Sequence, residues 1–295
     1  MNFGDTLKKI RTDKGQTQAK LSEGILARNH LSQVENNNYI PAYDKFFLLL
    51  DRLNVTFEEF LSVQNDSKIL FSRKLRSQIS EAANLADTEA LNDLSIEACE
   101  LYEKTDNITY YHSMLICKAL IAYNADLTIN QDMIEFVSPI KEYLFSMDNW
   151  YLYELKLFNN IIYALTVEEA LLFSRTSLKR LDNFQYFLEF RHIEQHIYTN
   201  LSTLCLEHRD FEVAKRFAEI AIEKAAKYTL VYEKICSELN YAIACIKLTG
   251  DESAYEVIEQ NMLIIRYLKF DDLHEHFSSF LRKFEIEMSA QKVSE

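Results

Sequence analysis

The chain has 295 residues, of which 48% are hydrophobic, and a net charge of −13 at pH 7. This length is sufficient for two domains, and the sequence has no apolar run of the roughly 20 residues that a membrane-spanning helix requires. Only four Gly and two Pro are present, which favours an all-helical protein because few residues remain for β-turns and long loops. The polar, charged start predicts no signal peptide. Five cysteines without C-x-x-C spacing predict reduced thiols in a cytoplasmic protein: Cys99, Cys117, Cys205, Cys236 and Cys245.

The acidic charge is confined to one part of the sequence. Residues 1–64 contain eight basic and eight acidic residues, so the whole net charge of −13 comes from residues 65–295. Within residues 1–33, six basic residues accompany three acidic ones. Because DNA phosphates repel an acidic surface, we expect any contact with DNA to be made by the N-terminal region.

Residues 17–38, TQAKLSEGILARNHLSQVENNN, predict two short helices joined by a tight turn. Thr17 can cap the first helix, and Gly24 can adopt the positive φ that a turn requires. The second predicted helix, residues 27–36, turns Leu31 and Val34 inward. Its other face carries side chains that can pair with base edges in a major groove, and we predict base contacts for Arg28, Asn29, Ser32 and Gln33. A solvated helix face is the simpler interpretation of these four residues taken alone.

The residues around this pair predict five short helices between residues 2 and 63. Their order and breaks resemble the Cro/repressor-type helix-turn-helix domain. The landmarks in this sequence are Gln18 three residues before Leu21, the segment ARNHLSQVENNN, Pro41, and the closing segment LDRLNVTFEEF. Pro41 is predicted to open a helix. Asn37 replaces a frequent Gly and can also adopt the left-handed conformation. We predict that the residues that contact or orient DNA phosphates are Lys8, Arg11, Gln18, Asn38 and Tyr43.

Helical repeats are predicted to follow a polar linker at residues 65–68, so that the domains are residues 1–64 and 69–295. Small Ala214, Ala218 and Ala221 lie where two helices would cross, and this unit resembles a tetratricopeptide repeat. Stacking of such units predicts a right-handed helical solenoid. The expected helical pairs span about 68–104, 108–147, 151–184, 190–227 and 232–269, with a closing helix at about 272–289.

The combination of a Cro-type head and about 230 residues of irregular repeats resembles the Rgg/GadR/MutR family of transcriptional regulators. The resemblance implies a homodimer that binds double-stranded promoter DNA through its heads. Many members also bind a short signalling peptide, a quorum-sensing pheromone, in the concave face of the repeat domain. Several members have a Cys in the fourth helix of the head. This chain has none before Cys99, so no disulfide is expected at that place.

Three asparagines recur at forty-residue spacing, Asn160, Asn200 and Asn240. An Asn amide offers one acceptor and two donors and can therefore pair with the backbone of an extended peptide. We predict a peptide site that also includes Lys156, Tyr163, Arg191, His196, Thr203 and Cys236. Lys156 or Arg191 would bind a peptide carboxylate. The alternative is that the asparagines stabilise helix crossings inside the solenoid.

The closing helix has an apolar stripe: Leu273, Phe277, Phe280, Leu281, Phe284 and Met288. A stripe of this size is not expected to face water. It either caps the last repeat or packs partly against a second subunit.

Other candidate sites are weaker. His192 and His196 lie one helical turn apart, but H-I-E-Q-H is not a metalloprotease motif and no third ligand is evident, so we predict no metal. A glycine-rich phosphate loop and a recognisable acid/base dyad are both lacking, so we predict neither a cofactor nor an enzyme. Two functions remain open: a ligand-responsive transcription regulator, and a scaffold that acts through protein–protein contacts without a peptide. The intact Arg28, Asn29 and Gln33 favour the first.

Overall fold

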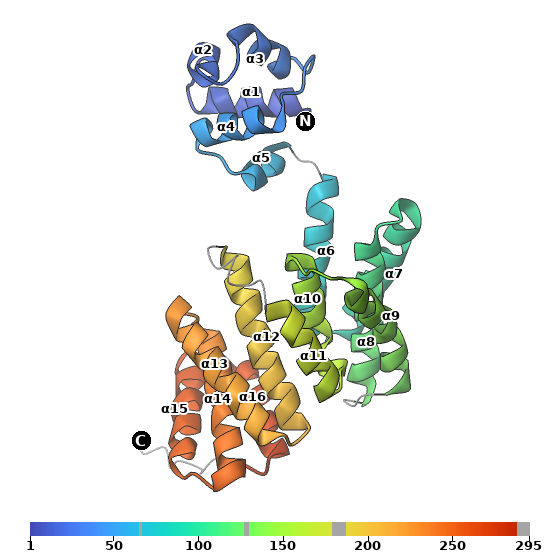
Figure 1. Ribbon diagram of the computed structural model, residues 1–295, viewed down its shortest axis with the longest axis vertical. Coiled ribbons are helices and arrows are strands. Elements are labelled where there is room, and N and C mark those ends of the chain that lie inside the picture. The colour runs from blue at the N-terminus through green and yellow to red at the C-terminus, as the bar shows by residue number, and fades with distance from the viewer. Residues whose placement is uncertain (65–66, 127–129, 179–186, 288–295) are drawn as a thin grey trace. The chain divides into compact units, whose positions relative to one another are not determined.

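The computed structural model describes residues 1–64, 67–126, 130–178 and 187–287, and every regular element in these residues is a helix (Figure 1). The prediction of an all-helical protein is confirmed for them. The chain forms two compact units, Met1–Asn124 and Ala125–Glu295. No helix among the described residues is long and apolar enough to cross a membrane.

The first unit begins with five short helices in the predicted order. Thr17 accepts a hydrogen bond from the Lys20 backbone N–H at 3.2 Å, and Gly24 and Asn37 have positive φ angles of 69° and 60°, as predicted. Pro41 does not open the fourth helix, because that helix starts two residues later, after Ala42 as its N-cap. The helices are α1 (Phe3–Asp13), α2 (Gln18–Ser22), α3 (Arg28–Glu35), α4 (Tyr43–Leu53) and α5 (Phe57–Gln64).

The head, as we call residues 1–64, has its own hydrophobic core. Leu7 from α1, Leu21 from α2 and Leu31 from α3 are fully buried, and burial of each such side chain contributes about 1.5–3 kcal/mol. Gly4 allows the closest approach in this core: a Cβ atom added there would lie 2.0 Å from the Val34 carbonyl oxygen. A glycine is therefore required at position 4 for α1 to pack against α3.

The first unit continues with three longer helices, α6 (Ser67–Asn84), α7 (Thr88–Thr105) and α8 (Ile108–Asp126), of which α8 extends across the boundary between the units. Asp87 caps α7, since its side chain accepts from the Ala90 backbone N–H at 3.0 Å. Residues 65–66 of the predicted linker lie outside the described residues.

The second unit contains the helices predicted for the later repeats (Figure 1). Pro139 lies inside a helix, as the sequence allowed. Parts of two predicted elements, residues 179–184 and 288–289, lie outside the described residues. The helices are α9 (Gln131–Ser146), α10 (Leu152–Ile161), the 3-10 helix η1 (Ile162–Ala164), α11 (Val167–Leu178), α12 (Leu188–Glu207), α13 (Phe211–Tyr228), α14 (Val231–Thr249), α15 (Ser253–Tyr267) and α16 (Asp271–Lys283).

Small residues allow these helices to pack closely. Ala214, Ala218 and Ala221 of α13 are fully buried, and α13 packs extensively against both α12 and α14. Across successive pairs, the first helices α10, α12 and α14 contact one another more than the second helices α11, α13 and α15 do, among the residues described. The first helices therefore line the inner side of the curved stack, which we call the inner face.

The closing helix α16 caps the stack. Phe277, Leu281 and Phe284 are buried in the core formed with α14 and α15, and Leu273 and Phe280 pack against that core. The apolar stripe is therefore used within the chain, and Met288 lies outside the described residues.

Candidate functional site

Helix α3 presents a polar face to solvent. Its inward residues Leu31 and Val34 are fully buried, whereas Arg28, Asn29 and Gln33 are exposed and Ser32 is half-buried. An Arg fork can bind the O6 and N7 atoms of guanine, and Asn or Gln can bind adenine. The structure therefore places all four predicted base-contacting residues on one helix, three of them fully accessible.

A buried polar cluster, which we call the Glu35 cluster, joins the buried side of α3 to its neighbouring helices. Glu35 is 2% exposed and accepts from Arg11 at 2.5 Å (Nε to Oε1) and 2.9 Å (Nη2 to Oε2). Gln18 donates to the same carboxylate at 2.8 Å, and Arg11 also donates to the Gln16 carbonyl at 2.6 Å. The hydrogen bond to Glu35 raises the pKa of Arg11. One carboxylate thus joins α1, α2 and α3.

Arg11 was predicted to contact DNA phosphates or to orient such contacts. Its guanidinium is buried and bonded to Glu35 and Gln16, so a direct phosphate contact does not fit the structure and only the orienting role stays a prediction. Gln18 is half-buried and fits the predicted role of orienting phosphate contacts, because it is fixed by Glu35 at the start of α2.

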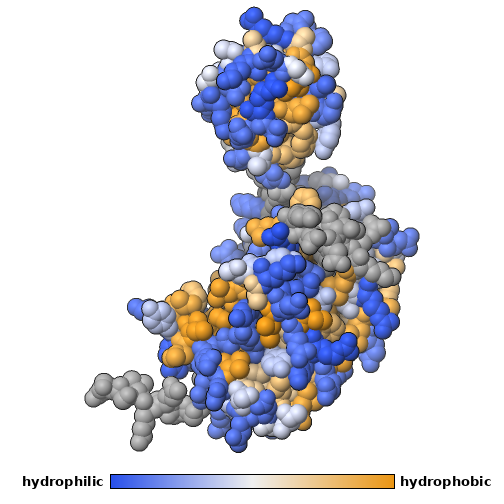
Figure 2. Space-filling view, turned by 60° about the vertical axis from the view of Figure 1, so that its left-hand side comes forward, coloured by the Kyte–Doolittle hydropathy of each residue, from blue (hydrophilic) through white to orange (hydrophobic). Residues whose placement is uncertain are grey.

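Three other predicted phosphate contacts, Lys8, Asn38 and Tyr43, are exposed. The Tyr43 ring is 76% exposed and lies 4.5 Å from the ring of Phe47, which is itself 6.2 Å from that of Phe57. Figure 2 shows hydrophobic residues on the surface of the head among hydrophilic ones. The head therefore combines a polar face on α3 with exposed aromatic rings on α4 and α5.

The inner face of the second unit brings two asparagines together. Asn200 of α12 donates to Oδ1 of Asn159 of α10 at 3.0 Å. The predicted peptide-binding residue Asn160 follows Asn159 in the sequence and is exposed. Consecutive residues of a helix point about 100° apart, so Asn159 and Asn160 lie on different sides of α10, and the role of Asn160 stays a prediction.

Asn240 has a structural role. It is 4% exposed, and its amide donates to the Thr199 carbonyl at 3.3 Å and to Oγ1 of Thr203 at 2.9 Å. The Thr203 hydroxyl also donates to the Thr199 carbonyl at 3.1 Å. These bonds join α14 to α12, so the predicted peptide contacts of Asn240 and Thr203 are replaced by the alternative, a stabilised helix crossing.

The same crossing contains polar residues that the sequence analysis missed. Gln195 is fully buried and donates to Thr199 and to Ser237 at 3.3 and 3.1 Å. Thr199 and Ser237 also share a hydrogen bond of 3.0 Å. Such polar residues on the inward sides of two helices are the signal that could have identified this crossing.

The remaining predicted peptide-binding residues lie on α10, η1, α12 and α14. Lys156 forms an ion pair with Glu189 at 3.0 Å in which both side chains are more than 40% exposed. Arg191 stacks over the ring of Tyr228 at 5.0 Å, and Tyr163 is half-buried. Burial raises the pKa of the Cys236 thiol to about 12, so this group is a neutral donor at physiological pH.

His196 belongs to a cluster with His192 and Glu233. Nδ1 of His192 and Nε2 of His196 each lie 3.4 Å from Oε1 of Glu233. The sequence analysis found no third ligand for the histidine pair. Glu233 occupies that position because α14 packs beside α12.

A head with an accessible α3 face and a stack of helical pairs define the chain as a helix-turn-helix regulator with a repeat domain. The chain belongs to the Rgg family: the model for the HTH-type transcriptional regulator Rgg, C-terminal domain, matches residues 95–279, and a helix-turn-helix model matches residues 7–60. The family resemblance inferred from the sequence is confirmed.

Solved structures have the same fold. The Streptococcus dysgalactiae SHP pheromone receptor Rgg2 is 19% identical with a TM-score of 0.74, covering 97% of this chain and 100% of that one. A putative transcriptional regulator from Listeria monocytogenes EGD-e is 19% identical with a TM-score of 0.79, covering 96% of each chain. Bacillus thuringiensis PlcR, in complex with the peptide PapR7 and DNA, is 16% identical with a TM-score of 0.66, covering 92% of this chain and 98% of that one.

Proposed function

We propose that this Rgg-family regulator binds promoter DNA as a homodimer, with Arg28, Asn29, Ser32 and Gln33 on base edges and Lys8, Asn38 and Tyr43 on phosphates. The observation that carries the proposal is the α3 face, which is accessible while the Glu35 cluster fixes the helix from behind. A single head spans too few bases for tight binding, so paired heads would read a two-fold site with half-sites about one helical turn apart.

The proposed ligand is a short peptide on the inner face. PlcR, which has the same fold, was solved in complex with the peptide PapR7. Asn159 and Asn200 form a pair on this face. Lys156 shares α10 with Asn159, Arg191 and His196 share α12 with Asn200, and Tyr163 lies in η1 directly after α10. Amide groups at this place can bind a peptide backbone, and Lys156 or Arg191 would meet a carboxylate. Because the net charge of residues 65–295 is strongly negative, a neutral or basic peptide suits the domain best.

The proposed subunit interface lies on α15 and the turn that follows it, because α16 is used as a cap. The exposed fractions of five apolar side chains in this segment range from 44% to 84%: Leu263, Ile264, Tyr267, Leu268 and Phe270. Tyr267→Glu should yield a folded monomer in size-exclusion chromatography with light scattering. Exposed Tyr255 gives a matched control, Tyr255→Glu, which should leave a dimer. A dimer in both variants would reject this interface.

The DNA contacts are tested by selecting bound sequences from a random duplex library. Arg28→Ala should relax the preference at one position of each half-site, at a cost of about 1–3 kcal/mol in the specific complex. Lys8→Ala should weaken all sequences alike and reduce the salt dependence by about one ion. Equal losses for specific and random DNA in both variants would contradict the assignment.

The peptide proposal is tested by purifying the full chain from its host and identifying co-purified peptides by mass spectrometry. The peptide found is then titrated into variants. Asn200→Ala should weaken binding by about five- to 150-fold, equivalent to about 1–3 kcal/mol, without changing DNA binding in the absence of peptide. If no peptide co-purifies and a protein does, the alternative of a regulator that acts through protein–protein contacts is favoured.

The absence of an apolar spanning helix among the described residues and the DNA-binding role support a cytoplasmic location. The proposal includes no catalytic step.

A further inference from the structure

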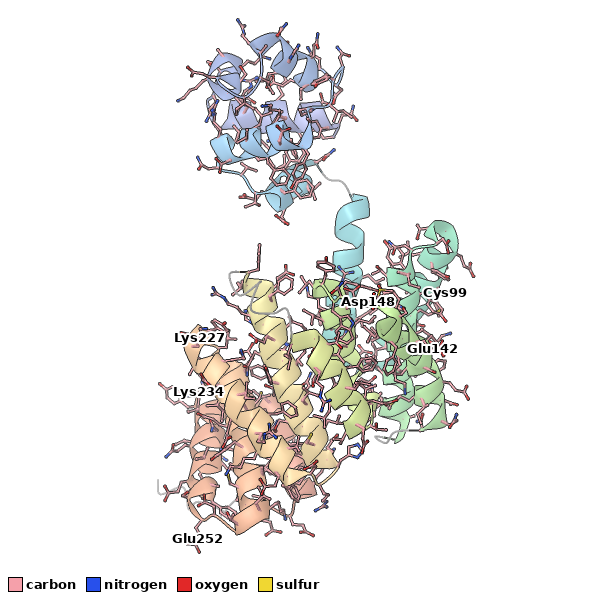
Figure 3. The ribbon with its side chains drawn as sticks, viewed as in Figure 1. Cys99, Glu142, Asp148, Lys227, Lys234 and Glu252 are labelled. Carbon is pink, nitrogen blue, oxygen red and sulfur yellow. The ribbon has the colours of Figure 1, made fainter. Side chains whose placement is uncertain are left out.

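His192, His196 and Glu233 form a compact group of nitrogen and oxygen ligands. The two histidines lie one turn apart on α12, so their imidazoles share one side of the helix, and Glu233 comes from the first turn of α14. The three ligand atoms lie within 4.8 Å of one another. In Figure 3, Lys234, the next residue in the chain after Glu233, is labelled near this end of α14.

The distances fit a shared ion as well as long direct contacts. Both imidazole nitrogens lie 3.4 Å from the same carboxylate oxygen, which is longer than the usual N–H···O range of about 2.7–3.2 Å. Zinc binds His nitrogen and carboxylate oxygen at about 2.0–2.2 Å in tetrahedral geometry, which places adjacent ligand atoms about 3.3–3.5 Å apart. The two nitrogen-to-oxygen distances of 3.4 Å equal the edge of such a tetrahedron.

We propose that Nδ1 of His192, Nε2 of His196 and a carboxylate oxygen of Glu233 bind a Zn²⁺ ion. Three protein ligands leave the fourth position to a water molecule, as in other open zinc sites. The histidine side chains are 40% and 44% exposed and the Glu233 side chain 14%, so the ion would be reached from solvent on the inner face. Nitrogen and carboxylate ligands suit zinc better than calcium or magnesium, which prefer oxygen alone.

The electrostatic setting also favours a cation. The repeat region carries the whole negative charge of the chain. Two basic residues adjoin the ligands in sequence: Lys234 pairs with Glu238 at 3.4 Å, and Arg191 lies over the ring of Tyr228. Metal binding requires neutral imidazoles, so affinity should fall as the pH is lowered and the histidines are protonated. The ion would join α12 to α14, and thus two successive helical pairs.

The test uses the full chain without an added histidine tag, peptide or DNA, so that it does not depend on the proposed regulator function. Co²⁺ is titrated as a spectroscopic substitute for Zn²⁺, and Zn²⁺ is then used to displace it. We expect one Co²⁺ per chain with the strong visible absorption of a tetrahedral site, and loss of this signal on addition of Zn²⁺. His192→Ala, His196→Ala and Glu233→Gln should each lower affinity by more than about 100-fold, because loss of a ligand should exceed the 10- to 100-fold effect of losing an outer-shell partner.

The matched control is His208→Ala, which removes an exposed histidine from the C-cap of α12 and should leave binding unchanged. Circular dichroism establishes that each variant is folded. If Glu233→Gln does not fold, the Co²⁺ affinities of His192→Ala and His196→Ala test the proposal. Absence of Co²⁺ binding, equal affinity in the histidine variants, or a thiolate-to-cobalt absorption band that identifies a cysteine ligand would overturn the proposal.

Discussion

The head and the inner face of the repeats both contain buried polar networks, but the networks lie in different places relative to the predicted binding residues. In the head, the Glu35 cluster lies behind α3 and leaves Arg28 and Gln33 exposed. On the inner face, the network at the α12–α14 crossing includes the predicted residues Thr203 and Asn240 themselves. Asn240, which is buried in the crossing, is therefore a weaker binding candidate than the exposed Arg28 and Gln33.

Glu35→Ala should have the largest effect, because it leaves the Arg11 guanidinium buried without its carboxylate. Loss of one partner of a buried ion pair costs about 3–5 kcal/mol, so the head should unfold at lower denaturant concentration. Circular dichroism reports the helices of the whole chain, whereas fluorescence of Trp150, the only tryptophan and a buried one, reports the second unit. A transition that appears in circular dichroism but not in fluorescence is therefore that of the first unit.

The control for this experiment is Arg28→Ala, an exposed substitution that should change stability by less than about 0.5 kcal/mol. Equal stability of the Glu35 and Arg28 variants would contradict the view that the Glu35 cluster stabilises the head while the exposed face of α3 does not.

His112 extends the comparison to a buried group that must stay neutral. Burial lowers its pKa to about 4 from an ordinary value of 6.5. Between these values the unfolded chain binds a proton that the folded chain does not, so the free energy of unfolding should fall as the pH decreases from 6.5 to 4. The loss at the acidic end is at most roughly 3 kcal/mol.

This pH dependence is measured by urea denaturation at a series of pH values. His112→Gln should flatten the curve in this range, while exposed His208→Gln serves as the control and should retain the slope. An unchanged slope in His112→Gln would show that another group causes the loss.

Gly4→Ala tests whether the α3 face depends on the packing behind it. The added methyl would meet backbone atoms of Val34 and Glu35 at 2.0 and 3.0 Å, so α1 and α3 must move apart. We expect a loss of about 1–3 kcal/mol, as for other overpacked cores, and weaker DNA binding in a fluorescence anisotropy titration.

Gly15→Asn provides the matched control. A Cβ at Gly15 meets no atom of the described residues within 4 Å, and Asn tolerates its positive φ. If both variants bind DNA as the unmodified chain does, close contact between α1 and α3 is not required for reading.

Asn240→Ala should have the smallest effect and tests the inner face directly. It removes two hydrogen bonds at the α12–α14 crossing, at a cost of about 1 kcal/mol. Asn160→Ala, at an exposed position, should cost less than about 0.5 kcal/mol. Thermal unfolding followed by Trp150 fluorescence measures both, and an equal or larger loss in Asn160→Ala would contradict the assigned roles.

The head could be predicted from the sequence in detail because its signals are local. Thr17 caps a helix, Gly24 and Asn37 adopt the left-handed conformation, and Leu31 and Val34 point inward. Each of these roles depends on only a few neighbouring residues. The helical pairs were predicted correctly for the same reason, because periodic apolar residues identify the helices one by one. The family was predicted from the resemblance of the head and the irregular repeats to the Rgg/GadR/MutR regulators.

The contacts of the inner face were harder to predict because they join residues about forty positions apart. The forty-residue recurrence selected Asn160 and Asn200 but not Asn159, which Asn200 contacts, because a helix turns by about 100° with each residue. Glu233 was missed as a neighbour of His192 for a related reason, since only the packing of α14 against α12 brings them together. The pairing of Arg11 with Glu35 was missed in the same way, because it joins α1 to α3.

The Glu35 cluster also has a consequence for how such regulators diversify. Because it fixes α3 through α1 and α2, the orientation of the helix does not depend on the identity of Arg28, Asn29 or Gln33. These three exposed positions can mutate with little effect on folding, and under the proposed base contacts each change would alter the promoter sequence that is read. A duplicated copy of the gene can thus acquire new target promoters by a few substitutions, while its repeat domain retains the ligand of the parent.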